Sequence, residues 1–249
     1  MTAIRVGVIG AGGRMGREVA RVVDSTDDMR LVAALGRNDP LERLTRSGAQ
    51  VVVELTHPDS VMKHLEFCVR HGIHTVVGTT GMTDERLNTL RRRLAASPGT
   101  GMIVGPLSVG AVLTTRLAQY AARWFESVEI MEMHHPDKAD APGGAAVRTA
   151  RLIAEARRKA GVPDQPDATT TVLPGARGAE VDGVPVHAVR ARGLVAHQTI
   201  VFGGTGETLT LPHDSTDRAC FTPGFLLGIR RVGSAPGLTL GLEPFMDLE

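Results

Sequence analysis

The sequence is poor in several features that define large classes of proteins. Aromatic residues make up only 3% of the 249 residues, which argues against the base-stacking surfaces that bind single-stranded nucleic acids. No apolar run approaches the ~18 residues of a membrane-spanning helix. Lys and Arg total 28 against 27 Asp and Glu, so the net charge is +1, and no overall field attracts a nucleic acid or an anionic membrane. We therefore expect a small-molecule ligand.

Cysteine is scarce as well. Cys68 and Cys220 are the two thiols, and each falls in an apolar helical pattern, so we expect reduced core residues and no disulfide framework. Residues 1–6 enter a strand pattern at once, without the pattern of a signal peptide. These features predict a cytoplasmic protein.

Short β-branched runs alternate with helical patterns through the first hundred residues. Met15, Val19, Val22 and Val23 share one face of the first expected helix. This alternation predicts a doubly wound parallel sheet flanked by helices. The expected strands are residues 4–9, 31–35, 51–55, 74–77 and 102–104.

The pattern changes after residue 105. A helix with Leu113, Leu117, Tyr120 and Trp124 on one face comes first. The remaining expected elements are a strand at 128–133, a helix through 153, antiparallel strands at 184–190, 196–202 and 207–211, and a helix at 221–232.

The predicted fold class is therefore α/β, with an N-terminal doubly wound Rossmann-type domain and a C-terminal α+β domain whose sheet is mostly antiparallel. We expect residues 1–105 to bind a dinucleotide, with 218–249 returning to that domain. Residues 106–217 are expected to bind substrate and to form the oligomer interface.

A glycine-rich loop joins the first strand to the first helix. Gly10, Gly13 and Gly16 fit GxxGxxG, and Arg14 and Met15 lie between the last two. Glycines here permit a tight turn, a close backbone approach to a pyrophosphate and close helix packing, while the helix N-terminus supplies N–H donors. The position in a βαβ unit favours this interpretation over a purely structural turn.

The end of the second strand bears on the choice of dinucleotide. NAD sites usually place a carboxylate there to accept from the ribose 2′-OH. This chain has Gly36 followed by Arg37, so we predict NADPH as the cofactor, with NADH as the weaker possibility. Arg37 is expected to contact the 2′-phosphate; the alternative is an ordinary solvated loop cation.

Two further segments are candidate site loops. Gly78, Thr79 and Thr80 follow the fourth strand, where α/β sheets bind ligands, although an ordinary turn has the same composition. His134, His135 and Lys138 leave a later strand, and such groups can protonate a carbanion and neutralise a carboxylate. A solvated polar loop is the alternative. No Cys, Asp or Glu cluster completes a metal set around the histidines, so no metal is predicted.

These segments occur together in a specific order. Thr56-His57-Pro58, the loop after the fourth strand, the block His134-His135-Pro136-Asp137-Lys138-Ala139-Asp140-Ala141-Pro142 and the segment 193–198 follow the glycine loop. In this the chain resembles the dihydrodipicolinate reductases, also called 4-hydroxy-tetrahydrodipicolinate reductases, of bacterial lysine and diaminopimelate biosynthesis, and most closely their actinobacterial branch. The resemblance covers nearly the whole chain.

The resemblance implies an NAD(P)H-dependent oxidoreductase that transfers a hydride to C4 of a conjugated cyclic imine and then a proton to the neighbouring carbon. It makes His134 the general acid and His135 and Lys138 partners of the substrate carboxylates, and it implies a homotetramer built through the second domain's sheet. The implied catalytic residues are His134 and Lys138, the substrate-binding residues His135, Gly143, Gly144 and Ala145, and the cofactor-binding residues Gly10, Gly13, Arg14, Met15, Gly16, Arg37, Thr56, Gly78, Thr79 and Thr80.

The chain departs from the family pattern at three places. Gly143-Gly144-Ala145-Ala146 stands where the family reads Ser-Gly-Thr-Ala, so two hydroxyls for a substrate carboxylate are missing. Pro106-Leu107 replaces an Asn-Phe pair at the domain crossing, which we expect to alter closure. Glu54 stands where Asp is usual.

These departures leave other functions open. A diverged relative would reduce a related cyclic imine carboxylate in another, secondary pathway. A non-catalytic dinucleotide-binding protein is a second alternative, which any NADPH oxidation with a cyclic imine would eliminate. An oxidative or dehydratase role is a third, which product analysis would separate from reduction.

Overall fold

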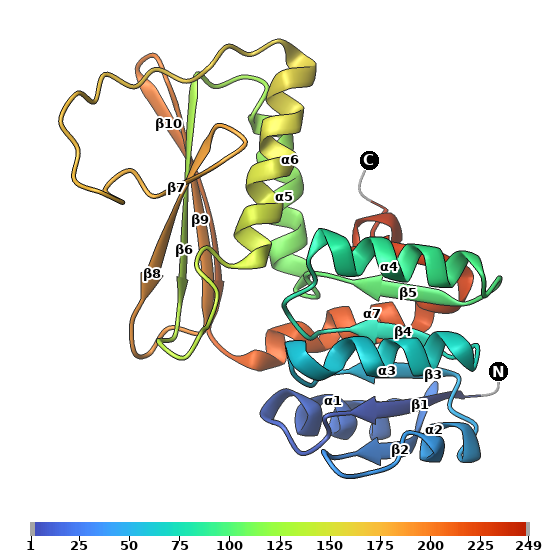
Figure 1. Ribbon diagram of the computed structural model, residues 1–249. Helices are drawn as coiled ribbons and strands as arrows, with labels where there is room; N and C mark the ends of the chain where they lie inside the picture. Colours follow the sequence, from blue (N-terminus) through green and yellow to red (C-terminus); the bar gives the residue numbers. More distant parts are fainter. Residues whose placement is uncertain (1–2, 248–249) are drawn as a thin grey trace. The chain divides into compact units, whose positions relative to one another are not determined.

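The computed structural model describes residues 3–247, which form two compact units (Figure 1). The first unit runs to Val109 and resumes at Ala219, and the second comprises Gly110–Arg218. Among the described residues, no helix combines the length and the apolar character needed to cross a membrane.

The first unit is built on a parallel sheet of strand order β11-β5-β4-β3-β1-β2. The central strands β3, β4 and β5 are buried on both faces apart from the half-buried His74, as a parallel sheet between helix layers requires. The doubly wound domain predicted from the alternating pattern is confirmed. The strands are β1 (Ile4–Ile9), β2 (Met29–Leu35), β3 (Val51–Glu54), β4 (His74–Val77), β5 (Gly101–Val104) and β11 (Gly237–Leu240).

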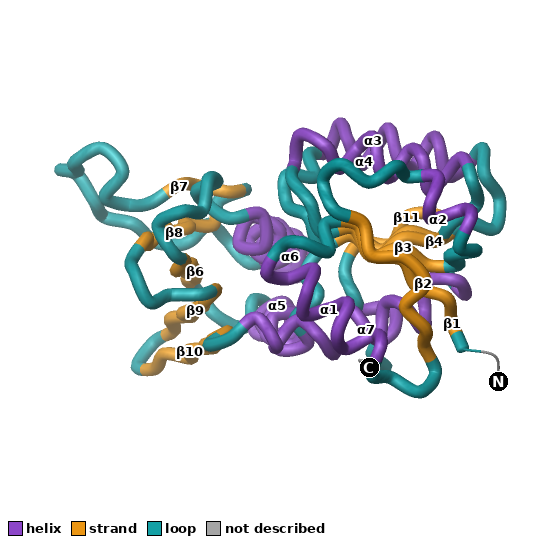
Figure 2. Tube along the Cα trace, turned by 90° about the horizontal axis from the view of Figure 1, so that it is seen from below, coloured by secondary structure: helices purple, strands orange, loops and turns teal. Residues whose placement is uncertain are grey.

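Helices cover both faces of this sheet. Figure 2 shows α3 and α4 on one face and α1 and α7 on the other. Val19 and Val23 of α1 are buried, while Met15 and Val22 from the same predicted face are half-buried. The helices are α1 (Arg14–Asp24), α2 (Glu42–Arg46), α3 (Pro58–Arg70), α4 (Asp84–Ala95) and α7 (Thr222–Arg231), with 3₁₀ turns at Arg218–Phe221, Val232–Ser234 and Glu243–Phe245.

The C-terminal segment returns to the first unit. Helix α7 lies within the predicted helix at 221–232 and packs on α1, β3 and β4. Strand β11, which was not predicted from the sequence, adds to the sheet beside β5 with Gly237 opposite Gly101. A four-residue strand with no strong alternation gives little local signal, so its pairing is fixed by the fold around it.

The second unit is a five-stranded sheet of order β10-β9-β6-β8-β7 with α5 (Val109–Ala121) and α6 (Gly144–Ala160) on one face. Strand β6 lies between β8 and β9 and is parallel to β8. The other pairs are antiparallel, so the predicted mostly antiparallel sheet is confirmed. The strands are β6 (Ser127–His134), β7 (Ala179–Val181), which was not predicted, β8 (Val184–Arg190), β9 (Ala196–Gly204) and β10 (Glu207–Ser215).

Small residues bring α5 close to this sheet. Ala118 and Ala121 of α5 share one buried cluster with Val128 and Ile130 of β6. The large side chains that were predicted to share a face of α5 lie on the opposite side and are 37% to 75% exposed: Leu113, Leu117, Tyr120 and Trp124. The helix therefore packs through its alanines.

Both cysteines are free thiols, as expected. Cys68 is buried, whereas Cys220 is only half-buried, so the expectation that both are core residues holds for Cys68 alone. Burial raises the pKa of the Cys68 thiol to about 12 despite a hydrogen bond with Thr75, so this side chain stays protonated.

Candidate active site

The glycine loop is shaped by two close backbone approaches. Gly10 has a φ of +87°, and a Cβ there would lie 2.3 Å from the Leu55 carbonyl oxygen. A Cβ on Gly16 would lie 2.0 Å from the Gly10 carbonyl oxygen. The Gly13 amide donates to that same oxygen at 2.9 Å. Side chains at positions 10 and 16 are therefore sterically excluded.

The N-terminus of α1 has the properties of an anion site. Its N-cap residue, Gly13, provides no side-chain cap, and the first turn contains no acidic residue. The free N–H groups and the positive end of the helix dipole suit a pyrophosphate. Arg14 is exposed at the first helical position, and Met15 behind it is half-buried. The loop therefore fits a dinucleotide, as its glycines indicate.

The loop after β2 contains a carboxylate, Asp39, that was not considered when the dinucleotide was predicted from the sequence. Arg37 is exposed there. The Asp39 carboxylate accepts from the Gly36 amide at 2.8 Å and pairs with Arg43. The Gly36 hydrogen bond and the Arg43 contact outweigh desolvation and lower the pKa of Asp39. Arg37 is accordingly separate from the ion pair that Asp39 forms.

A buried carboxylate joins the loops that follow β3 and β4. Glu54 is fully buried, and both Thr56 Oγ1 and Thr79 Oγ1 donate to it. Its Oε1 also lies 3.0 Å from His64 Nδ1 of α3, and Thr79 Oγ1 accepts from the Thr56 amide at 2.8 Å. Thr56 and Thr79, both predicted to bind the cofactor, thus have their hydroxyls engaged within the protein.

The other two residues of the predicted loop differ in environment. Thr80 is exposed. A Cβ on Gly78 would lie 2.6 Å from Leu55 Cδ2 and 2.8 Å from Phe225 Cζ. Glycine at position 78 is therefore required for packing, whatever it contributes to a ligand.

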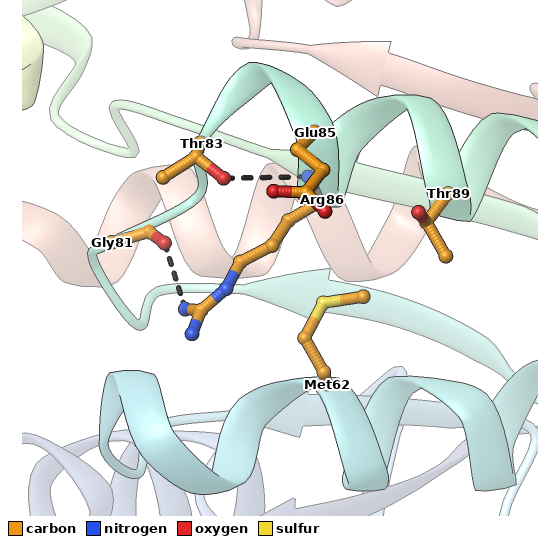
Figure 3. A pocket seen from close by; sticks show the side chains of 6 residues that line it. All are labelled: Met62, Gly81, Thr83, Glu85, Arg86 and Thr89. Carbon is orange, nitrogen blue, oxygen red and sulfur yellow. Dashed lines mark hydrogen bonds between the residues drawn. The ribbon is translucent and has the colours of Figure 1, made fainter.

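A hollow of about 520 Å³ lies between α3 and α4 (Figure 3). It is lined by Met62, Gly81, Thr83, Glu85, Arg86 and Thr89. Arg86 Nη1 donates to the Gly81 carbonyl at 2.9 Å, and the Arg86 amide donates to Thr83 Oγ1 at 3.4 Å. None of the predicted cofactor-binding residues lines this hollow.

In the second unit, the buried face of β6 leads directly to the predicted general acid. Alternation along the strand puts Val128, Ile130, Glu132 and His134 on one face, and the first three are buried. The side chain of His134 is 19% exposed, and its Nδ1 contacts Glu132 Oε2. His134 therefore lies at the edge of the buried core.

The loop from β6 to α6 brings Lys138 next to the start of α6. Lys138 Nζ pairs with the Asp140 carboxylate, whose other oxygen accepts from the Gly144 amide at 3.2 Å. A Cβ on Gly143 would lie 2.9 Å from Lys138 Cε and 3.7 Å from His134 Cε1. His134, Lys138 and Gly143 thus form one cluster.

The remaining predicted residues of this unit lie beside that cluster in the chain. Ala145 is exposed in the first turn of α6. His135 is half-buried, and its Nδ1 has no hydrogen-bond partner within the described chain. The predicted site residues therefore form two groups, one in each unit.

Glu132 and Arg190 were not predicted from the sequence as residues of the site. Arg190 donates from Nη2 to Glu132 Oε1 at 2.7 Å and from Nη1 to Oε2 at 3.0 Å. Burial opposes the charge of Glu132, but the hydrogen bonds from His134 and Arg190 outweigh it and lower the pKa of this carboxyl to about 2. Strand alternation places Glu132 beside His134, whereas no local signal brings in Arg190.

Within residues 3–247, no group of three or more His, Cys, Asp or Glu side chains is arranged to hold a metal ion. The His134-His135 pair in particular gains no further ligand of these types.

The chain matches one family along nearly its whole length. Residues 4–106 match the family described as "Dihydrodipicolinate reductase, N-terminus" and residues 110–246 match "Dihydrodipicolinate reductase, C-terminus". The chain belongs to the dihydrodipicolinate reductase family. It is an oxidoreductase of the NAD(P)H-using type, and the resemblance drawn from its motifs is confirmed.

Relatives in this family cover the chain from end to end. The 4-hydroxy-tetrahydrodipicolinate reductase of Streptomyces griseus is 63% identical over 249 residues, covering 100% of both chains. That of Nocardia farcinica is 59% identical, covering 98% of this chain and 99% of the relative. The dipicolinate-bound dihydrodipicolinate reductase from Paenisporosarcina sp. TG-14 is 38% identical, with a TM-score of 0.80 over 98% of this chain and 99% of that structure.

More distant structures share the fold alone. The apo scyllo-inositol dehydrogenase of Lactobacillus casei has a TM-score of 0.63 at 11% identity, over 96% of this chain and 91% of that one. At this identity the likeness carries no information about substrate.

The close approach at Gly16 predicts the outcome of a paired substitution. Gly16→Ala places a Cβ against the Gly10 carbonyl oxygen, which no rotamer relieves, whereas nothing lies within 4 Å of a Cβ at Gly12. We expect Gly16→Ala to lower the free energy of unfolding of the first unit by about 1–3 kcal/mol. Gly12→Ala, the matched control, should change it by less than ~0.5 kcal/mol. Urea unfolding measures both, and equal effects would contradict the steric argument.

The low pKa of Glu132 predicts how stability depends on pH. The carboxyl titrates at about 2 when folded, against an ordinary value of 4.5. Its ionised form therefore stabilises the folded state above pH ~4.5, and this contribution is lost as the pH falls toward 2.

We expect Glu132→Gln to reduce the free energy of unfolding near pH 6 by an amount on the order of 3 kcal/mol. The difference from the parent protein should shrink steadily below pH ~4.5. Urea titrations of both proteins at several pH values test this, and a difference that stays constant from pH 6 to pH 3 would refute it.

Proposed function

We propose that this chain is an NADPH-dependent 4-hydroxy-tetrahydrodipicolinate reductase of lysine and diaminopimelate biosynthesis. The observation that carries the proposal is the cluster of His134, Lys138 and Gly143, in a chain 63% identical over its full length to reductases of that name. The glycine loop before α1 supports the cofactor half of the proposal. The reaction reduces a conjugated cyclic imine.

The residues of the chain have separate roles in this reaction. The reduced nicotinamide, when bound, supplies a hydride for C4 of the substrate ring. His134 then delivers a proton at the neighbouring carbon as general acid, which contributes roughly 10²–10⁴-fold to the rate. Lys138 holds a positive charge close to His134 and stabilises the negative charge that develops on the substrate.

The substrate carboxylates bind Lys138, His135 and the start of α6, where the amides of Gly144 and Ala145 are the donors and Gly143, whose amide donates to Glu132, supplies the space beside them. In the free protein the Asp140 carboxylate holds Lys138 Nζ and the Gly144 amide. A substrate carboxylate therefore exchanges places with Asp140 at these donors. The helix N-terminus and the lysine bind this anion without the family's serine and threonine hydroxyls.

On the first unit, the pyrophosphate binds at Gly10, Gly13, Arg14, Met15 and Gly16, at the N-terminus of α1. Because the hydroxyls of Thr56 and Thr79 bind Glu54, these residues and Gly78 shape the floor of the nicotinamide site through their backbone. Thr80, which is exposed, offers its hydroxyl.

The proposal includes a cytoplasmic homotetramer. Met131 and Val189 are 37% and 43% exposed on neighbouring strands of the second unit's sheet. Alternation places them on the face that α5 and α6 leave open. This apolar face suits sheet-to-sheet association between copies of the chain. The unpaired thiols agree with a reducing compartment.

A coupled assay tests the reaction. Purified protein is given NADPH and enzymatically generated 4-hydroxy-tetrahydrodipicolinate, and the loss of cofactor absorbance is followed. We expect robust turnover, with kcat lowered ~10²–10⁴-fold in His134→Ala. The matched control is His187→Ala, which removes a histidine of β8 that pairs with Glu129 and should leave kcat within about twofold. NADPH affinity should be unchanged in both variants, because both residues lie in the second unit.

Failure of the parent protein to turn over, despite tight NADPH binding, would point to the diverged relative. The loss of hydroxyls at positions 143 and 145 favours that second candidate, a reductase of a cyclic imine with one carboxylate. Cyclic imines that lack the second carboxylate are the substrates to test in that case.

The cofactor preference rests on Arg37 and on the absence of a carboxylate at Gly36. We expect Arg37→Ala to raise the KM for NADPH about 10-fold, since a charge-assisted hydrogen bond is worth ~1.5–3 kcal/mol and this side chain is exposed. The KM for NADH should not change. Arg91→Ala on α4, an exposed arginine that donates to Asn88, is the control for a lost surface charge. Equal changes for the two cofactors would rule out a contact between Arg37 and the 2′-phosphate.

A further inference from the structure

Glu132 is the most deeply buried charged group of the second unit's site. Its side chain is 1% exposed, and it lies on the same face of β6 as His134. Both carboxylate oxygens are used: Oε1 accepts from Arg190 and from the Gly143 amide at 3.1 Å, and Oε2 accepts from Arg190 and from His134. Burying a carboxylate is favourable only with such a set of donors.

The contact with His134 fixes the tautomer of the ring. An ionised carboxylate can only accept hydrogen bonds, and the pKa of Glu132 near 2 keeps it ionised at neutral pH. The proton on His134 Nδ1 must therefore point at Glu132. Nε2 is left as the nitrogen that exchanges a proton with a ligand.

Arg190 stabilises the ionised form of Glu132, so that the proton stays on His134. Strand register puts Arg190 directly opposite His134 on β8, and its guanidinium binds both oxygens of Glu132. This fork supplies the positive charge that the buried carboxylate needs, so Glu132 need not take the proton from His134. Arg190 Nη2 also donates to the Asp140 carbonyl at 2.7 Å, which ties the Lys138 loop to the same pair.

The Gly143 amide connects Glu132 to the start of α6. Because Glu132 Oε1 accepts from this amide, one carboxylate fixes both the histidine ring and the first residues of the helix that is to receive the substrate carboxylate. A Cβ on Gly143 would lie 3.7 Å from His134 Cε1, so the helix start and the ring are close neighbours.

We propose that Glu132, held by Arg190, is a positioning residue that keeps one proton on His134 Nδ1, so that the neutral ring is the Nδ1–H tautomer and the catalytic proton is taken up and delivered at Nε2, which is directed to the substrate. This inference rests on the proposed function, in which His134 is the general acid. Neither Glu132 nor Arg190 touches the reacting atoms; they act through His134 and through the start of α6.

The first test is ¹⁵N NMR of histidine-labelled free protein, at a pH where the ring of His134 is neutral. Comparison with His134→Ala identifies the signals of His134. We expect Nδ1 to carry the proton in the parent protein. A ring that carries its proton on Nε2 would overturn the proposal, and this measurement requires neither substrate nor a Glu132 variant that folds.

The second test combines Glu132→Gln with a control on the same strand. At the place of Oε1 two groups can only donate, Arg190 Nη2 and the Gly143 amide, so the amide oxygen of the new side chain should lie there and its NH₂ group should turn toward His134. That forces Nδ1 to accept and moves the proton to Nε2. We expect the tautomer to reverse and kcat to fall about 10²-fold or more, because Nδ1, which then accepts from the amide, can no longer be protonated and the ring cannot form the imidazolium that delivers a proton from Nε2. Affinity for NADPH should not change.

Glu129→Gln is the matched control, since Glu129 lies on the opposite face of β6 and pairs with Arg177 and His187. It should leave the His134 tautomer unchanged and kcat within about twofold. Glu132→Asp, which keeps the charge, should retain the Nδ1–H tautomer and recover part of kcat. A Glu132→Gln protein that is folded and shows the parent tautomer, or the parent kcat, refutes the positioning role. If the parent protein itself fails to reduce the substrate, the proposed reaction is wrong while the tautomer result stands on its own.

Discussion

Both units are organised around the need to compensate a buried carboxylate at the end of a central strand. Glu54 closes β3 and is fully buried, and Glu132, near the end of β6, is almost as inaccessible. An uncompensated charge in such a place costs several kcal/mol, so the chain must bring donors to it. At Glu54 these come from Thr56, Thr79 and His64, and at Glu132 from His134, Arg190 and the Gly143 amide. The donors include residues expected to form the site, so the loops are placed by the same interactions that stabilise the core.

This constraint explains why the altered start of α6 is compatible with anion binding. Gly143 leaves room for Lys138, whose Cε would lie 2.9 Å from a Cβ at that position. The chain has lost a hydroxyl donor at this position but keeps the lysine of the family block, whose ammonium group lies close to the helix start. Because the ammonium carries a full charge and the hydroxyl only a dipole, the loss preserves attraction for a carboxylate while relaxing the geometry with which it is held.

Local signals in the sequence predicted the features that depend on neighbours in the chain. The glycines at positions 10 and 16 indicated a close backbone approach, and the alternation of β-branched runs with helical patterns indicated the parallel sheet. Pairings between distant segments were not predictable: β6 enters between β8 and β9, and β11 adds to β5. Arg190 lies 58 residues from Glu132, so its part in the site follows from that unpredicted pairing. Thr56 and Thr79 were both expected to bind the cofactor, but their hydroxyls bind Glu54, which the sequence marked only as a departure from the family pattern.

The likeness of this chain to distant structures is limited to the fold, so its reaction must depend on the residues of the site. An inositol dehydrogenase at 11% identity shares the fold, and its substrate is chemically remote from a cyclic imine, so the fold by itself leaves the reaction open. What separates the families must lie in the groups that touch substrate. In this chain the residues proposed to bind substrate lie on one connection, from the end of β6 to the first turn of α6, which is held by Glu132 at the Gly143 amide and by Arg190 at the Asp140 carbonyl. A short segment held at both of these points can change its side chains, as at positions 143 and 145, without disturbing the sheet on which His134 lies.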